Sequence, residues 1–498
     1  MNWLKQVWET GRIGKFFVGT QYRSSVAGAI ALLLVTSSML LGNPETLARR
    51  PEFRPEQSDV TAAPVEELAP QVTDTAAVAV ETPGAPRSGR TGPTQTKGGV
   101  QITTSAEGVP VADIFTPAED RIGITNSQIT LCTHAALSLG PAFDARPEDF
   151  DIYWRNLNDN GGVHGRKVQA TFEDDTYLPD KAVLAAEECN KGRPFILGGG
   201  IGFDQIPAVR AWAENNHVLY MHHMASEDLS KKYSFSFFPT VNKTGEMFGE
   251  WIAKKHPGKK VGVVWRNSDN WKPGYTGFKE TIGNAVTLVA ELPVRAQQAV
   301  YSNEIDELER KGAEVVFFWE NALMATDMIK QAKEQEFNPT WVVFPFNTTT
   351  DTLGAEAGDL DIEGISAWPA YSLGEYGGPF SAYADELRRF EAAQAKYGHP
   401  DSTPNDVLFM TWMAAKQMHQ LLLDCGRDCT RNKIAGLLLT GRHKEVQPNC
   451  PLDFTRNGHV GGHTLIAMET YVKSRTRTEE HPLGTSGWRE LERCKEHF

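Results

Sequence analysis

Residues 158–175 read NDNGGVHGRKVQATFEDD, which places a helix end, a glycine turn and an extended strand in a fixed order. Residues 160–162, Asn-Gly-Gly, accept positive φ angles and can therefore stop a helix. Gly165 allows a second tight bend, and residues 168–172 then alternate between apolar and polar side chains as a half-buried strand does. This stretch predicts a helix that turns directly into a strand.

The segments around this stretch continue the alternation of strand and helix. Upstream, a β-like run begins at Ile129, a Gly-Pro loop occupies residues 139–141 and a helix is expected over residues 150–157. Downstream, helices alternate with short, continuously apolar runs, which are typical of strands buried on both faces. These expected strands cover residues 195–197, 218–221, 261–265, 315–319 and 341–345. The order predicts the α/β class, with doubly wound parallel sheets.

Four motifs follow one another through this region. They are LSLGP at residues 137–141, NGGVHGRKV at 160–168, EDDTYLPDKAV at 173–183 and ILGGG at 196–200. Their order and spacing resemble the branched-chain-amino-acid-type family of extracytoplasmic solute-binding proteins, the ligand receptors of ABC importers. A looser match continues to about residue 475. The resemblance implies a type I periplasmic binding fold, in which two doubly wound parallel-sheet lobes are joined by a multi-strand hinge and the ligand cleft lies between them.

The resemblance also implies how the chain is divided. Lobe one is expected to span residues 121–240 plus 366–445, lobe two residues 241–365 plus 446–475, and residues 476–498 are expected to be a C-terminal tail. A chain of 498 residues with 40% hydrophobic residues is able to bury cores of this size. The formal net charge of −13 argues against nucleic acid, or an anionic membrane surface, as the main partner of the folded part.

The N-terminus differs from the rest of the chain. Basic residues precede a run of apolar and small residues at 26–41, which with its neighbours approaches the length of a membrane span. We expect residues 1–42 to be a cytoplasmic stub and an uncleaved transmembrane anchor, so that the remainder is extracytoplasmic and tethered to the membrane. A cleavable signal peptide is the alternative, with a weak site at residues 46–48. Residues 43–120, rich in Pro, Ala and Thr, are expected to form a disordered linker.

The six cysteines suit an exported protein, because disulfides persist outside the cytoplasm. Proximity favours the pairs Cys132–Cys189, Cys425–Cys429 and Cys450–Cys494, although six cysteines permit other pairings. Cys425 and Cys429 are also spaced as half of a metal site, but no second half follows at a spacing typical of zinc. We therefore expect disulfides, with no metal and no cofactor.

Three loops of lobe one follow strands at the sheet edge where ligands bind in open α/β folds. The resemblance implies that they contact the ligand through Ser138, Gly202, Phe203, His223, Ala225 and Ser226. Amino-acid-binding relatives usually carry a hydroxyl where this chain has Gly202 and Phe203, and a contacting Thr where it has Ala225. The missing hydroxyl, together with the carboxylate that relatives carry near Asn347 and this chain lacks, argues against an ordinary branched-chain amino acid as the ligand. His223 is able to donate to a polar or acidic ligand, although adjacent histidines in a loop are more often structural.

Lobe two is expected to contribute aromatic and polar side chains. The expected ligand-binding residues of lobe two are Trp271, Glu320, Asn321 and Asn347, and Trp368, which follows the expected crossing strand, is expected to join them. Relatives that bind α-amino acids place a carboxylate near Asn347, and Glu320 is the candidate to replace it here. Together with Trp319 and Phe346, the two tryptophans indicate a cleft suited to stacking or apolar surface, although each also has a reading as core or hinge.

These features predict a receptor and not an enzyme. It would capture a small polar or aromatic solute by lobe closure and deliver it to an ABC permease, as a monomer. The sequence contains no GxSxG, Walker or HExxH motif. A ligand-sensing domain for a separate signalling partner is the alternative from another class. Catalysis by Asp174 and Asp175 is a third, but these carboxylates fit better as caps of the turn that follows.

Overall fold

The chain divides into two compact units, Met1–Pro83 and Gly84–Phe498. In the computed structural model, the described residues all lie in the second unit. They are 95–97, 99–138, 145–200, 202–222, 232–320, 322–343, 362–366, 381–402, 404, 406–446, 450–457, 459–462, 464–471 and 488–496. The expected membrane segment and the linker up to residue 94 are outside these ranges. Within them, no helix combines the length and the hydrophobicity that crossing a bilayer requires.

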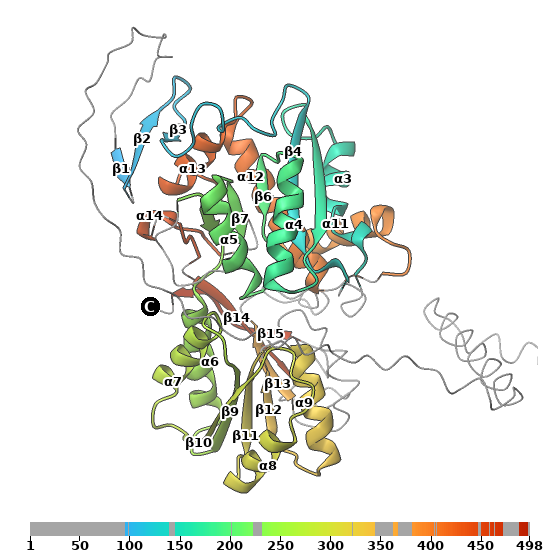
Figure 1. Cartoon of the computed structure of the whole chain (residues 1–498), viewed down its shortest axis with the longest axis vertical. Coiled ribbons are helices and arrows are strands. Elements are labelled where there is room, and N and C mark those ends of the chain that lie inside the picture. Colours follow the sequence, from blue (N-terminus) through green and yellow to red (C-terminus); the bar gives the residue numbers. More distant parts are fainter. Residues whose placement is uncertain are drawn as a thin grey trace, which may run out of the picture. The chain divides into compact units, whose positions relative to one another are not determined.

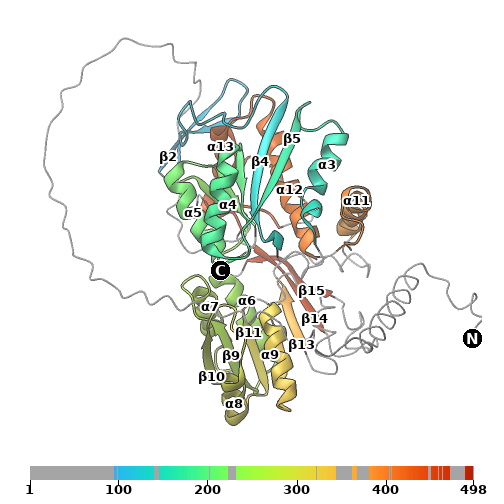
Figure 2. The same ribbon diagram turned by 45° about the vertical axis from the view of Figure 1, so that its right-hand side comes forward.

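The sheet of lobe one has five parallel strands in the order β5-β4-β6-β7-β8, of which Figure 1 labels β4, β6 and β7. The strands are β4 (Gln128–Ala135), β5 (Lys167–Asp174), β6 (Ile196–Gly198), β7 (Tyr220–His222) and β8 (Ser234–Ser236). Alternation along β4 explains why both faces are covered. Cys132 packs with α4 (Pro179–Lys191) and α5 (Gln205–Asn216), whereas its neighbour Leu131 packs with α3 (Ile152–Asp159), α12 (Asp406–Cys425) and α13 (Arg431–Leu439). Figure 2 shows α3 and α12 beside β5, with α11 (Ser381–Tyr397) outside them.

The sheet of lobe two has seven strands in the order β10-β9-β11-β12-β13-β14-β15. The strands are β9 (Lys260–Arg266), β10 (Thr287–Val294), β11 (Val315–Trp319), β12 (Thr340–Val343), β13 (Ile362–Ser366), β14 (Thr464–Tyr471) and β15 (Trp488–Glu496), of which the last two are antiparallel. Val263 of β9 packs with α6 (Val241–Lys255) and α7 (Lys272–Ile282), while Val264 packs with α8 (Ser302–Lys311) and α9 (Ala322–Glu334). The α/β class with parallel sheets is therefore confirmed.

The expected disordered linker is wrong for residues 95–120. This region contains a three-stranded antiparallel sheet of β1 (Gln95–Lys97), β2 (Val100–Thr104) and β3 (Pro110–Ala112). Val100, Ile102 and Ala112 are buried in the core shared with α12 and α13. Large apolar residues are sparse in residues 43–120, so the average composition of this segment predicts disorder. The strands form because these few apolar side chains pack against a helix that is distant in the sequence.

The C-terminal boundaries also differ from the expectation. Residues 450–462, assigned to lobe two, contact lobe one instead, because Val460 bridges Ser236 of β8 and Phe454 packs against Phe235 and Phe237. Helix α14 (Phe454–Asn457) belongs to this segment. After residue 462 the chain returns to the lobe-two sheet, and β14 is the first strand of this return. Residues 488–496 of the expected tail are strand β15, which pairs with β14.

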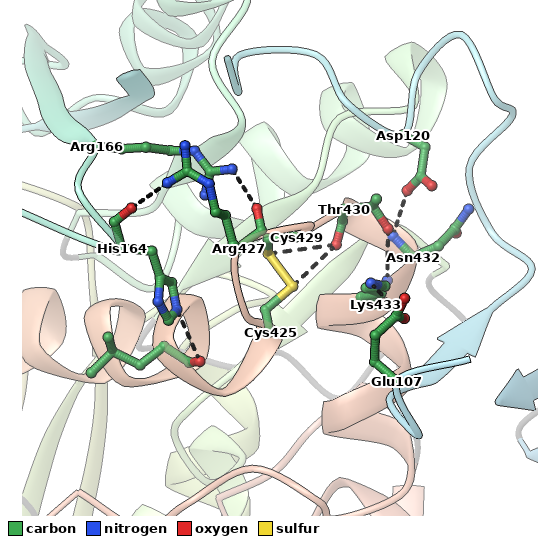
Figure 3. The surroundings of a disulfide bond; sticks show 11 residues. Glu107, Asp120, His164, Arg166, Cys425, Arg427, Cys429, Thr430, Asn432 and Lys433 are labelled. Carbon is green, nitrogen blue, oxygen red and sulfur yellow. Dashed lines mark hydrogen bonds and ion pairs between the residues drawn. A yellow bond between two sulfur atoms is a disulfide. The ribbon is translucent and has the colours of Figure 1, made fainter. Parts of the chain in front are cut away.

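Disulfides join Cys132 to Cys189 and Cys425 to Cys429. Both are pairs that the sequence favours. Cys450 is also disulfide-bonded, while the side chain of Cys494 lies outside the described residues. The first disulfide ties β4 to the end of α4, and the second closes the turn between α12 and α13 (Figure 3).

Asn432, at the start of α13, connects the small N-terminal sheet to lobe one. Its Oδ1 accepts hydrogen bonds from the backbone N–H groups of Ile114 (3.0 Å) and Phe115 (2.8 Å), and its Nδ2 donates to the carbonyl of Phe115 (2.8 Å). The backbone N–H of Asn432 donates to Asp120 (2.7 Å), as Figure 3 shows. The Asn432 side chain is buried, so it satisfies backbone groups that water does not reach.

We expect Asn432→Ala to lower the free energy of unfolding by about 2–3 kcal/mol, because it leaves buried backbone groups of residues 114 and 115 without partners. Urea unfolding of the full chain measures this change. The control is Asn216→Ala at the exposed end of α5, where the amide donates only locally to the carbonyl of Trp212 and the expected change is below about 0.5 kcal/mol. Equal losses in the two variants would contradict the anchoring role of Asn432.

Candidate functional site

The loops that follow the strands of the two lobes meet at three aromatic rings. Phe203 precedes α5 in lobe one, Trp271 precedes α7 in lobe two, and Trp319 ends β11. The ring centroid of Phe203 lies 4.6 Å from that of Trp271 and 6.0 Å from that of Trp319. All three side chains are buried in one hydrophobic cluster that runs through both lobes. In this structure the lobes therefore contact each other through an apolar surface.

Trp319 is held in place by its own lobe. Its Nε1 donates a hydrogen bond to the carbonyl of Trp271 (2.9 Å). Gly274, in the first turn of α7, allows the indole to lie against the helix, because a Cβ at this position would be 2.1 Å from Cζ2 of Trp319. The two tryptophans thus form a fixed surface of lobe two on which Phe203 rests.

A buried ionic cluster lies beside these rings. The guanidinium of Arg266, at the end of β9, contacts Oδ2 of Asp204 at 2.6 Å and Oε1 of Glu320 at 3.1 Å. Asp204 comes from lobe one and Glu320 from lobe two, so Arg266 joins carboxylates of both lobes. Ser268 and Asn270 each donate to Oδ1 of Asp204 (3.0 Å). These hydrogen bonds orient the carboxylate toward Arg266 and compensate its removal from water.

Glu320 was expected to hold a ligand ammonium group, and it faces Arg266 in this structure. Arg266 and Asp204 were not among the expected site residues. A signal was present, since Arg266 directly follows the apolar run of β9 and Asp204 follows a glycine loop, but the partner of each lies in the other lobe or in a distant loop. Within the described residues, the guanidinium of Arg266 thus faces two carboxylates, one from each lobe.

Other carboxylates at the strand ends of lobe one have structural partners. Asp174 Oδ1 accepts hydrogen bonds from the backbone N–H groups of Ser138 (3.1 Å) and Thr176 (3.0 Å), so it caps the turn after β5. Asp175 Oδ1 accepts from the N–H of Tyr177 (2.9 Å). Both carboxylates therefore have the capping role that the sequence favours over catalysis.

Asp175 also begins a buried chain of polar groups. Its Oδ2 lies 2.8 Å from Nδ1 of His134, and Nε2 of His134 lies 2.8 Å from the hydroxyl of Tyr220. Burial raises the pKa of the Tyr220 phenol well above its ordinary value, so the hydroxyl keeps its proton beside the His134 ring. All three residues are fully buried. This chain of hydrogen bonds fixes β4, β7 and the Asp175 turn relative to one another.

The remaining expected site residues are placed only in part. Ser138 is exposed just beyond the end of β4. Gly202 precedes α5 with φ +127, a backbone conformation that L side chains rarely adopt, and a Cβ there would be 1.8 Å from Oε1 of Gln205, so a side chain at this position would be strained. The structure thus brings Gly202, Phe203, Trp271 and Glu320 into one region. His223, Ala225, Ser226, Asn321, Asn347 and Trp368 lie outside the described residues.

Comparison with known sequences identifies related proteins. A family model described as periplasmic binding protein matches residues 149–475. The chain is 27% identical over 167 residues to Leu/Ile/Val-binding protein homolog 3 of Brucella melitensis, covering 32% of this chain and 45% of that protein. It is 23% identical over 216 residues to the leucine-, isoleucine-, valine-, threonine- and alanine-binding protein of Pseudomonas aeruginosa, covering 42% and 57%. The chain therefore spans about half the length of these curated relatives.

Solved structures resemble the fold more completely. A fatty acid ABC transporter substrate-binding protein from Thermomonospora curvata has a TM-score of 0.61 at 17% identity, covering 79% of this chain and 96% of that one. A branched-chain amino acid ABC transporter protein from Thermus thermophilus with bound valine has a TM-score of 0.57 at 15% identity, covering 75% and 97%. A solute-binding protein from R. palustris in complex with benzoate has a TM-score of 0.57 at 16% identity, covering 74% and 97%.

We expect Phe203→Ala to separate the lobes of the protein without added solute. The variant loses the packing of Phe203 on Trp271 and Trp319, and a truncation of this size in a core lowers the free energy of unfolding by about 3 kcal/mol or more. Small-angle X-ray scattering of the full chain is expected to show a larger radius of gyration.

The matched control is Phe278→Ala. Phe278 is fully buried and packs against Phe317, within lobe two alone. It is expected to cost similar stability and to leave the radius of gyration unchanged. If the two variants have the same radius of gyration, the Phe203 contact does not hold the lobes together.

Proposed function

The chain belongs to the periplasmic binding protein family, and from this premise we propose that it captures a small solute between its two lobes and delivers it to an ABC importer. The family match, the Leu/Ile/Val-binding relatives and the structural neighbours confirm the resemblance that the sequence predicts. These relatives are named as binding proteins, which agrees with a receptor that performs no reaction.

The contact between the lobes supports a mechanism of hinged closure. The Phe203–Trp271–Trp319 surface and the Asp204–Arg266–Glu320 cluster lie where the strand ends of the two sheets face each other. A solute that touches both lobes adds contacts in the closed arrangement that the open one lacks. Binding therefore shifts the equilibrium toward closure by the difference in affinity.

The chain crosses between the lobes three times, which supports motion of each lobe as a unit. It passes from β8 to α6, from β13 to α11, and from the segment ending at residue 462 to β14. Three connections restrict the motion to rotation and small shifts about a shared hinge, while each lobe keeps its own core on both faces of its sheet.

The solute we propose carries an apolar part, because aromatic side chains dominate the described part of the contact region. The structural neighbours named above are associated by their titles with a fatty acid, valine and benzoate. These molecules share a carboxylate joined to an apolar group, and we extend this chemistry to the present chain. The absence of a side chain at Gly202 continues to argue against ordinary branched-chain amino acids.

We further propose that the protein works outside the cytoplasm, with an ABC permease as its partner. The disulfides Cys132–Cys189 and Cys425–Cys429 support this location, since such bonds are rare in reducing compartments. The role of residues 1–42 as a membrane anchor is part of the proposal and rests on their sequence.

Thermal-shift measurements on the full chain test the function. The panel contains amino acids, amides, aromatic acids and short-chain carboxylates. A true ligand at about one hundred times its Kd is expected to stabilise the protein by about 2.7 kcal/mol and to reduce the radius of gyration in solution. Asn216→Ala, far from the contact region on the exposed end of α5, serves as a control that keeps the response. If no compound stabilises the protein, the proposed function is wrong. If only aliphatic branched-chain amino acids stabilise it, the proposed ligand class is wrong.

A further inference from the structure

Lobe one contains a cavity of about 80 Å³ between its sheet and helix α12. Thr133 and Ala135 of β4 and Gly199, just after β6, line the side toward the sheet. Phe150 and Trp154 close it from the side of α3. The cavity therefore lies under the carboxyl ends of the strands and not in the middle of the core.

Helix α12 forms the opposite wall with a single face. Its lining residues are at positions 407, 410, 411, 414, 415 and 418, the spacing of one helical stripe. Ala414 and Ala415 have small side chains at the point where α12 passes over the sheet, and the space between helix and sheet is therefore left unfilled. Met410 and Met418 stand at either side, and their unbranched side chains adapt readily to a guest.

The cavity wall is chemically uniform. No ionisable side chain is among the described residues that line it. Its side-chain hydroxyls are those of Thr133 and Thr411, and the Thr411 hydroxyl already donates to the carbonyl of Val407 (3.0 Å). A charged or strongly polar group would lose its hydrogen bonds to water here without gaining partners in the protein. An alkyl group makes no such hydrogen bonds and has none to lose.

The volume of the cavity limits the shape of the group that can bind in it. An engineered protein cavity of about 150 Å³ accepts benzene, so about half that volume is too small for an aromatic ring. It holds roughly two to three groups of the size of a water molecule or a methylene. An unbranched alkyl segment matches this space.

The position connects the cavity to the candidate site. Ala136 and Gly200 belong to its lining, and each lies two residues before an expected ligand residue, Ser138 and Gly202. A solute held by the strand-end loops is therefore able to direct a short tail beneath them into lobe one.

We propose that the solute is amphipathic and that its unbranched alkyl tail enters this cavity, between β4 and α12. The inference rests on the proposed function and specifies its substrate class. The tail is bound by lobe one alone, so chain length determines how strongly the solute binds before the lobes close.

Isothermal titration calorimetry on the full chain tests the proposal with two series of probes, straight-chain carboxylates from acetate to decanoate and the corresponding amides. Affinity is expected to rise about fourfold for each methylene that enters the cavity, over two to three methylenes, and then to level off. Affinity that is independent of chain length in both series, or no binding in either, overturns the proposal.

Ala414→Leu fills the cavity and provides the matched variant. It is expected to weaken binding of the longer chains about 20- to 60-fold, the product of the lost fourfold steps, and to leave the shortest members unchanged. Ala395→Leu on the exposed face of α11 is the control and keeps the full dependence on chain length. Met418→Ala enlarges the cavity and is expected to move the plateau to longer chains, which gives a second readout independent of the first. Unchanged chain-length profiles in both cavity variants overturn the proposal.

The outcomes separate this inference from the function on which it rests. If the wider solute panel stabilises the protein while both alkyl series are flat, the receptor function stands and the alkyl pocket is wrong. If neither the panel nor the series binds, the receptor function itself fails.

Discussion

Among the described residues, Arg266 forms an ion pair between the two lobes, and it acts together with the Phe203 contact to hold them in this arrangement. Its guanidinium lies between a carboxylate of lobe one and a carboxylate of lobe two, with Phe203 and the tryptophans excluding water beside it. Breaking a buried pair costs several kcal/mol if a charge is left without a partner inside the protein. When lobes separate, however, water replaces the lost partner. The cluster therefore resists partial separation more than full opening, which suits the hinged closure that we propose.

Several features of the fold follow from local sequence. Residues 158–175 predict the end of α3, the turn and β5, and continuous apolar runs predict the buried parallel strands of both sheets. The two described disulfides are also pairs that the sequence favours, one local and the other between residues 57 apart. The exceptions are elements whose stability comes from distant partners. Strands β1 to β3 depend on α13, and β15 depends on β14, so short polar sequences in these places resemble linker and tail.

The site shows the same division. The sequence indicates that Phe203, Trp271 and Glu320 lie near strand ends, because parallel strands bring their following loops to one edge. It does not indicate that Phe203 packs against Trp271, or that Glu320 shares Arg266 with Asp204, since these contacts join loops of different lobes. His134 and Tyr220 were missed for a related reason. Each is a single polar residue within an apolar strand, and its partner becomes visible only when the strands are paired.

The docking of the small N-terminal sheet on α13 affects how this protein should be shortened for study. The family match begins at residue 149, and β4 begins at Gln128, so a cut just before Gln128 would keep the matched region and every strand of the lobe-one sheet. A cut there would remove the groups that Asn432 binds and would uncover the apolar surface on which Val100 and Ile102 rest. The trimmed protein would tend to aggregate, and a failure to bind solute would then reflect a damaged lobe and not the wrong solute.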